Sequence, residues 1–257
     1  MHQRKTASWI AVGALAVVGG FWLTTRSLQI LQVGDVWLPY AGHFVGALLA
    51  AAMMVAHAAL RPWREPVAAA VIAVGVLAVL FLVLPQPWFS WVAARSTYPW
   101  LMVLALMGVT AAGALCGALI ARRVASTTPH TTKLVLLSAL TITGCSVTLL
   151  HFAGGTGLAS DPASGILVVM MVLGVVFGGF VVQRMVTTYR PRTIGGGATL
   201  LALSTFGETG LSAEMVKALM SSLLLGCIGA IGARLARRWV VTPDPTAHAS
   251  LPSARLR

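Results

Sequence analysis

Two nine-residue stretches, LHFAGGTGL at positions 150–158 and LSTFGETGL at positions 203–211, agree at five of nine positions without a gap. The offset between them is 53 residues. Each copy ends one apolar run and leads into the next. The pattern therefore predicts an internal repeat of two helical hairpins, 133–184 and 186–237, within a membrane protein.

Composition defines the class of protein. Of the 257 residues, 58% are hydrophobic and 9% are charged, and the mean hydropathy is +0.87. A soluble domain of this size cannot bury so much apolar surface in one core, so an all-α, polytopic integral membrane protein is expected. A transmembrane barrel would show short segments of alternating polarity instead of these long apolar runs.

Eight apolar runs of about twenty residues can each cross a bilayer. The predicted transmembrane helices are 8–24, 38–60, 67–84, 100–121, 134–153, 165–182, 194–213 and 218–235. The first follows a basic N-terminus and is expected to remain as an uncleaved span. The seventh begins with three glycines and contains Glu208, so seven spans plus a re-entrant segment is the alternative.

The net charge of +12 follows the positive-inside rule rather than indicating a nucleic-acid partner. With eight spans and the N-terminus inside, only Arg26, Arg95 and Lys217 of the 18 Lys and Arg residues lie outside. We therefore expect a plasma (inner) membrane protein with both termini cytoplasmic. It comprises a single transmembrane domain, 1–241, and a disordered cytoplasmic tail, 242–257.

Glycine pairs predict close contacts between the helices. Gly113 and Gly117 form one small-xxx-small pair, and Gly174 and Gly178 form another. Such pairs allow two helix backbones to approach closely. We interpret both as packing inside one chain rather than as a dimerisation motif.

A transport site is the leading functional hypothesis. Glu208 is the one carboxylate within a predicted span, and an intramembrane charge is costly unless it faces water or a partner. Gly154, Thr156, Gly207 and Thr209 occupy matching positions of the two repeat copies. We expect these residues and Glu208 to line an outward-opening cavity that binds a small solute, an ion or a proton, because transporters are commonly built from repeated units.

Histidines suggest two alternatives, a metal site and a haem. His43 and His57 lie 14 residues apart on one predicted helix, which places them on one face about 21 Å apart, the spacing of two stacked haems. His43 and His151 both lie toward the outer surface, where they can form one axial pair for haem b or ligate a metal. An electron-transfer or non-catalytic subunit of a membrane complex is therefore a further alternative.

The sequence GCSVTLLHFAG at 144–154 resembles the motif of MHYT-type membrane sensors. That motif has Gly, a β-branched residue three positions later, and then Met-His-Tyr/Phe-x-Gly. The resemblance implies that His151 helps to hold a metal, proposed to be copper, that senses a diatomic gas. It covers one hairpin only: Leu150 replaces the motif Met, and Ser204 stands at the His position of the second copy.

An enzyme is not expected, because the sequence contains no nucleotide-binding loop, H-E-x-x-H or G-x-S-x-G motif and no paired carboxylates. The expected partners are the lipid bilayer and a small solute, with a homo-oligomer or a larger membrane complex as the expected assembly.

Overall fold

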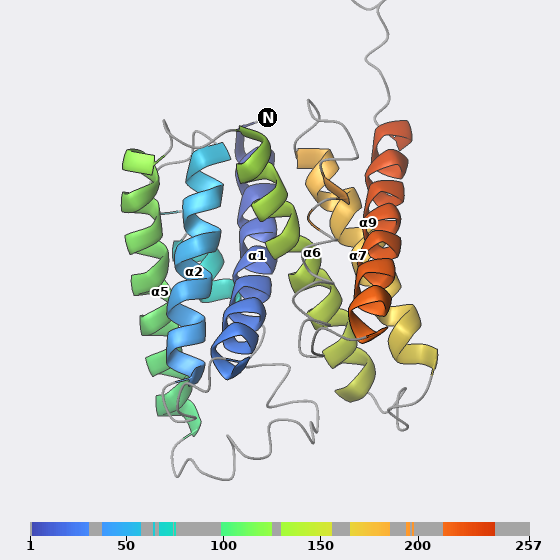
Figure 1. Cartoon of the computed structure of the whole chain (residues 1–257). Helices are drawn as coiled ribbons and strands as arrows, with labels where there is room; N and C mark the ends of the chain where they lie inside the picture. The colour runs from blue at the N-terminus through green and yellow to red at the C-terminus, as the bar shows by residue number, and fades with distance from the viewer. Residues whose placement is uncertain are drawn as a thin grey trace, which may run out of the picture.

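The protein is helical throughout the residues that the structure describes. The computed structural model describes residues 2–30, 38–57, 64, 67–73, 75, 99–124, 130–155, 165–185, 194–195, 197 and 213–239. The long helices in this part of the chain are α1 (His2–Ile30), α2 (Leu38–His57), α5 (Pro99–Val124), α6 (His130–Gly155), α7 (Gly165–Met185) and α9 (Ala213–Trp239) (Figure 1). The predicted all-α class is confirmed.

Several helices have the length and composition of membrane spans. Within the described residues, four do so, over the windows Ser8–Thr25, Leu104–Ala121, Thr131–Leu150 and Val168–Met185. In α2 the apolar segment Tyr40–Ala56 is shorter. Large apolar side chains such as Leu104 on α5, Val169 on α7 and Leu224 on α9 are exposed, as expected for surfaces that contact lipid.

Two of the eight predicted spans are described only at their beginnings. Residues 67–73 and 75 of the third span are helical, and so are 194–195 and 197 of the seventh. Most of residues 186–212, the first part of the predicted hairpin 186–237, therefore lie outside the described residues. The eight-span count and the superposition of the two repeat hairpins stay predictions.

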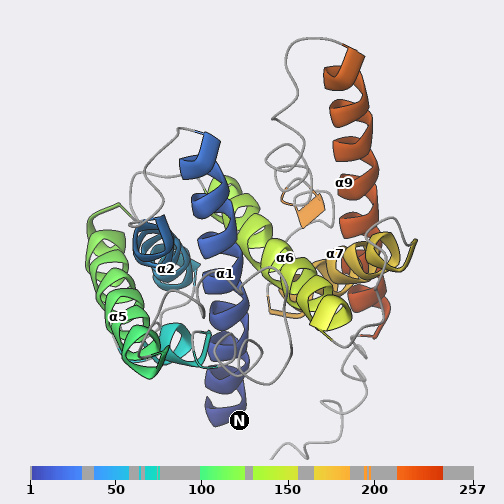
Figure 2. The same cartoon turned by 90° about the horizontal axis from the view of Figure 1, so that it is seen from below.

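Helix α6 occupies the centre of the molecule. Figures 1 and 2 show α1 and α6 beside each other, with α2 and α5 on one side and α7 and α9 on the other. Leu137 and Leu140 of α6 belong to a core shared with α1 and α2, whereas Leu134 and Ile142 belong to a second core shared with α7 and α9. Of the four candidate spans, the one in α6 is the most buried.

Glycines allow α1 and α6 to meet backbone to backbone. A Cβ atom on Gly19 would lie closer than 3 Å to the carbonyl oxygen of Leu140, and one on Gly144 would do the same at Leu15. Each glycine thus contacts the residue four positions before the other glycine, so the two helices contact each other reciprocally. Any larger side chain at either position would have to displace backbone, which is the least movable part of a packed helix pair.

The small-xxx-small pairs pack within the chain, and that prediction is confirmed. Gly113 and Gly117 of α5 lie against the backbone of α2 at Phe44 and Leu48. In the other half of the molecule, Gly174 and Gly178 of α7 lie against Ser146 and Ile142 of α6. Close helix approach is thus a shared feature of both sides of the bundle.

We predict that Gly144→Leu lowers the stability of the protein, whereas Gly108→Leu does not. A side chain at Gly144 would push into the α1 backbone, and overpacking of this kind costs on the order of 1–3 kcal/mol. A Cβ on Gly108 of α5 would meet nothing within 4 Å, so the same substitution there serves as the control. The melting temperatures of the two variants are measured by thermal unfolding in detergent. Equal values would contradict the close packing of α6 on α1 at Gly144.

Candidate functional site

A buried histidine lies where α1, α2 and α5 meet. Gly42 and Gly46 bring α2 against α1, since a Cβ on Gly42 would collide with the Thr25 hydroxyl and one on Gly46 with the backbone at Phe21. His43, between these glycines, is buried at 5% exposure. Its ring stacks on Phe21 of α1, with the centroids 4.1 Å apart and the planes at 23°. The histidine that the sequence singled out as a ligand therefore lies inside the bundle.

Thr110 of α5 determines which nitrogen of His43 carries the proton. Its hydroxyl donates to the carbonyl oxygen of Leu106 over 2.5 Å, and the same oxygen lies 3.3 Å from His43 Nδ1. A threonine hydroxyl has one hydrogen, which the Leu106 bond uses. The contact with His43 therefore requires Nδ1–H to donate to Thr110, and Nε2 keeps a free lone pair in the neutral ring.

This arrangement can do two kinds of chemistry. The contact with Thr110 is made by Nδ1, so Nε2 is the nitrogen that can accept a proton or bind a metal ion. Histidine ligands of metals typically donate their other ring N–H to an oxygen, and the bond to Thr110 has that form. The described part of the chain contains no group of three His, Cys, Asp or Glu side chains that would complete a metal site by itself.

Unpartnered hydroxyls are a second polar feature of the bundle. In the described structure, Thr25, Thr141 and Ser146 each have a buried side-chain oxygen without a hydrogen-bond partner. In contrast, Ser138 and Thr143 of α6 bond the carbonyl four residues earlier, over 2.7 and 2.6 Å. An unsatisfied buried oxygen is costly in a membrane interior, so these oxygens are positions where water or a polar solute would be stabilised.

The predicted site residues are only partly described. His43 is buried in α2, His57 ends that helix, and His151 and Gly154 lie in the last turns of α6. The remaining predicted residues, Thr156, Gly207, Glu208 and Thr209, lie outside the described residues. The pairing of His43 with His151 and the cavity around Glu208 therefore stay predictions.

Sequence reasoning missed Thr110 and Phe21 as the partners of His43. Thr110 was visible as a hydroxyl inside the apolar run 100–121, which is a signal for an interhelical hydrogen bond. Nothing in the sequence indicated which helix it would face. Phe21 gave no signal, because an aromatic residue in an apolar span is ordinary.

Comparisons with known proteins give no relative. No family model, curated protein or solved structure matches the chain.

We predict that Thr110→Val destabilises the protein more than Thr143→Val. Valine at 110 removes the acceptor for His43 Nδ1–H and leaves a buried donor without a partner, at a cost on the order of 1 kcal/mol. Thr143 is equally buried, but the bond shown for it goes to a carbonyl of its own helix, so valine there should cost less. Thermal unfolding in detergent provides the comparison, and a larger loss for the Thr143 variant would contradict the assigned hydrogen bond.

Proposed function

We propose that the protein is a small-solute transporter of the plasma membrane, with eight spans and both termini in the cytoplasm. The observation that carries this proposal is the reciprocal contact of α1 and α6 through Gly19 and Gly144. In the predicted topology α1 and α6 both begin at the cytoplasmic surface, and for two such helices a contact of this form is what an approximate two-fold axis along the membrane normal would produce. The two halves related by this axis would be 1–124 and 130–239.

Further contacts support two related halves. In each half the second helix lies antiparallel to the first through a glycine pair: Gly42 and Gly46 pack α2 on α1, and Gly174 and Gly178 pack α7 on α6. A third segment then packs on the first helix of each half. In the first half Ala69 meets α1 at Gly13.

In the second half Gly197 meets α6 at Ser138, the residue six positions before Gly144. Gly13 likewise lies six positions before Gly19 on α1. The third segments therefore contact matching points of the two central helices. Parallel repeats about an axis along the membrane normal are one of the architectures on which secondary transporters are built, with the substrate bound near the midplane between them.

Glu208 remains the residue on which we place solute or proton binding. It follows the glycine-rich start of the seventh predicted span, beside Gly207 and Thr209. The unpartnered hydroxyls of Thr141 and Ser146 on α6 add polar groups inside the bundle. A transporter needs such groups inside an otherwise apolar bundle, because a polar solute must replace its hydration there.

We expect Glu208→Gln to abolish transport and Glu214→Gln to leave it intact. Glutamine keeps the size of the side chain but loses its charge and its proton. Glu214 occupies the first turn of α9, near the predicted outer surface, and is the control carboxylate. Proteoliposomes on a solid-supported membrane, challenged with small organic acids, amino acids and inorganic ions under a pH gradient, give the transport current.

A cysteine at position 208 reports on the depth of the site in the same preparation. Slow labelling by a membrane-impermeant thiol reagent is expected. Full activity of the Glu208→Gln variant together with free labelling would place the residue among the headgroups and remove it from the site.

The geometry of His43 favours a metal or haem protein as the second candidate function. Its Nδ1 contacts the Thr110 hydroxyl, and a neutral histidine that donates through Nδ1 carries its lone pair on Nε2, as a histidine ligand does. His151 is the partner that the sequence suggests.

The visible spectrum and metal content of the purified protein separate the two functions. If His43 is a ligand, we expect a Soret band or stoichiometric copper that is lost in His43→Gln and kept in Cys227→Ser, a change at an exposed residue of α9. A wild-type protein without haem or metal would leave transport, or a non-catalytic role in a membrane complex, as the function.

A further inference from the structure

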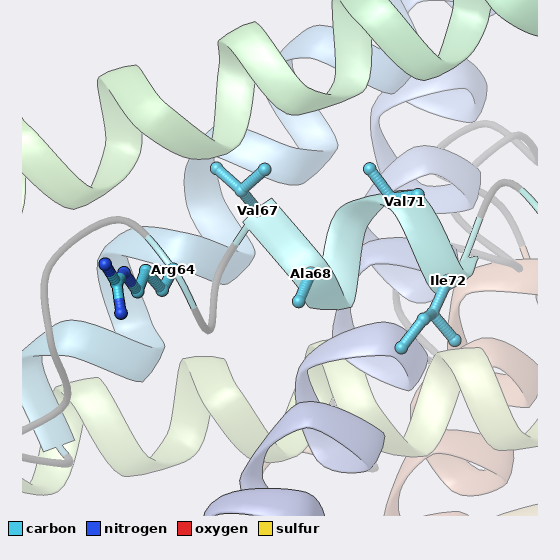
Figure 3. A pocket seen from close by; sticks show the side chains of 5 residues that line it. All are labelled: Arg64, Val67, Ala68, Val71 and Ile72. Carbon is cyan, nitrogen blue, oxygen red and sulfur yellow. The ribbon is translucent and has the colours of Figure 1, made fainter.

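A groove lies beside the short helical segment 67–73. It is lined by Arg64, Val67, Ala68, Val71 and Ile72 and has a volume of about 480 Å³. Figure 3 shows the Arg64 side chain at one end of this groove and Ile72 at the other. That volume lies within the roughly 300–1,000 Å³ typical of sites for small organic ligands.

The lining of the groove is apolar because of the way the segment packs. Ala69, Ala70 and Ala73 are fully buried, and Ala70 and Ala73 belong to the core formed with α1 and α2. Val71 and Ile72 are exposed. One face of this segment is thus fixed against the bundle, and the opposite face presents branched side chains.

The charge at the end of the groove indicates which molecule fits it. Arg64 belongs to the connection after α2, where Arg61 and Arg64 outnumber Glu65. The positive-inside rule places this connection at the cytoplasmic surface. That leaflet carries the anionic lipids, and basic sites between helices on this side bind their headgroups.

We propose that the groove binds an anionic phospholipid of the cytoplasmic leaflet. One acyl chain lies along Val67, Ala68, Val71 and Ile72, and the phosphate contacts Arg64. The apolar lining excludes a free phosphate as the main ligand, because such an ion would gain nothing from four hydrocarbon side chains. This inference does not depend on whether the protein transports a solute.

Native mass spectrometry of the full-length protein tests the proposal. The probes are dioleoylphosphatidylglycerol and dioleoylphosphatidylcholine, which share acyl chains and differ in charge. We expect the wild type to retain phosphatidylglycerol preferentially, and Arg64→Gln to weaken this retention about fivefold, since one arginine near an anionic surface contributes about 1 kcal/mol. Ala68→Phe, which fills the groove, should weaken retention of both lipids.

Arg234→Gln is the matched control, because Arg234 is an exposed arginine on α9. It should leave retention unchanged. Loss of lipid in this variant equal to that in Arg64→Gln would show a general charge effect and overturn the site. Displacement of the lipid by millimolar inorganic phosphate would assign the site to a free anion and overturn the proposal as well.

A measurement on the wild type keeps the proposal testable even if a variant misfolds. Phosphatidylglycerol with a photoreactive diazirine in its acyl chain should label the peptide that contains residues 67–72. Labelling spread evenly over the exposed faces of α5, α7 and α9, or a concentration-dependent dimer that protects this peptide, would overturn it.

Discussion

The structure depends on the close approach of α1 and α6. In a membrane interior no hydrophobic effect drives helices together, so association relies on dispersion and on how near two backbones can come. Gly19 and Gly144 remove the side chains that would hold these helices apart. Both hydrophobic cores include residues of α6, so this contact also determines how the two sides of the molecule are placed.

Some buried polar side chains in the bundle have a hydrogen-bond partner and others have none. The two kinds contribute to function in different ways. The hydrogen bonds that join His43 to Thr110, and Thr110 to the Leu106 carbonyl, connect α2 to α5 and determine the tautomer of the imidazole. The oxygens of Thr141 and Ser146 have no such partner in the described structure. The hydrogen-bonded histidine makes the bundle more rigid and leaves Nε2 as its second ring nitrogen. The unpartnered hydroxyls are positions where a polar molecule would be bound favourably.

The sequence was sufficient to predict the helical membrane class and the role of Gly174 and Gly178, because composition and small-residue spacing act locally. It could not predict that Gly19 meets Leu140 or that His43 meets Thr110, since those contacts depend on which helices become neighbours. The 53-residue repeat remains a prediction. The reciprocal contacts instead relate α1 to α6, about 125 residues apart, where the sequence shows little identity because packing constrains only a few small residues.

The most direct test of this account is an experimental structure in a lipid nanodisc, with measurement of the rotation that superposes α1 and α2 on α6 and α7. We predict a rotation near 180° about the membrane normal, with the axis passing between Gly19 and Gly144. A structure in which another helix or lipid separates α1 from α6, or in which no such rotation superposes the pairs, would contradict it.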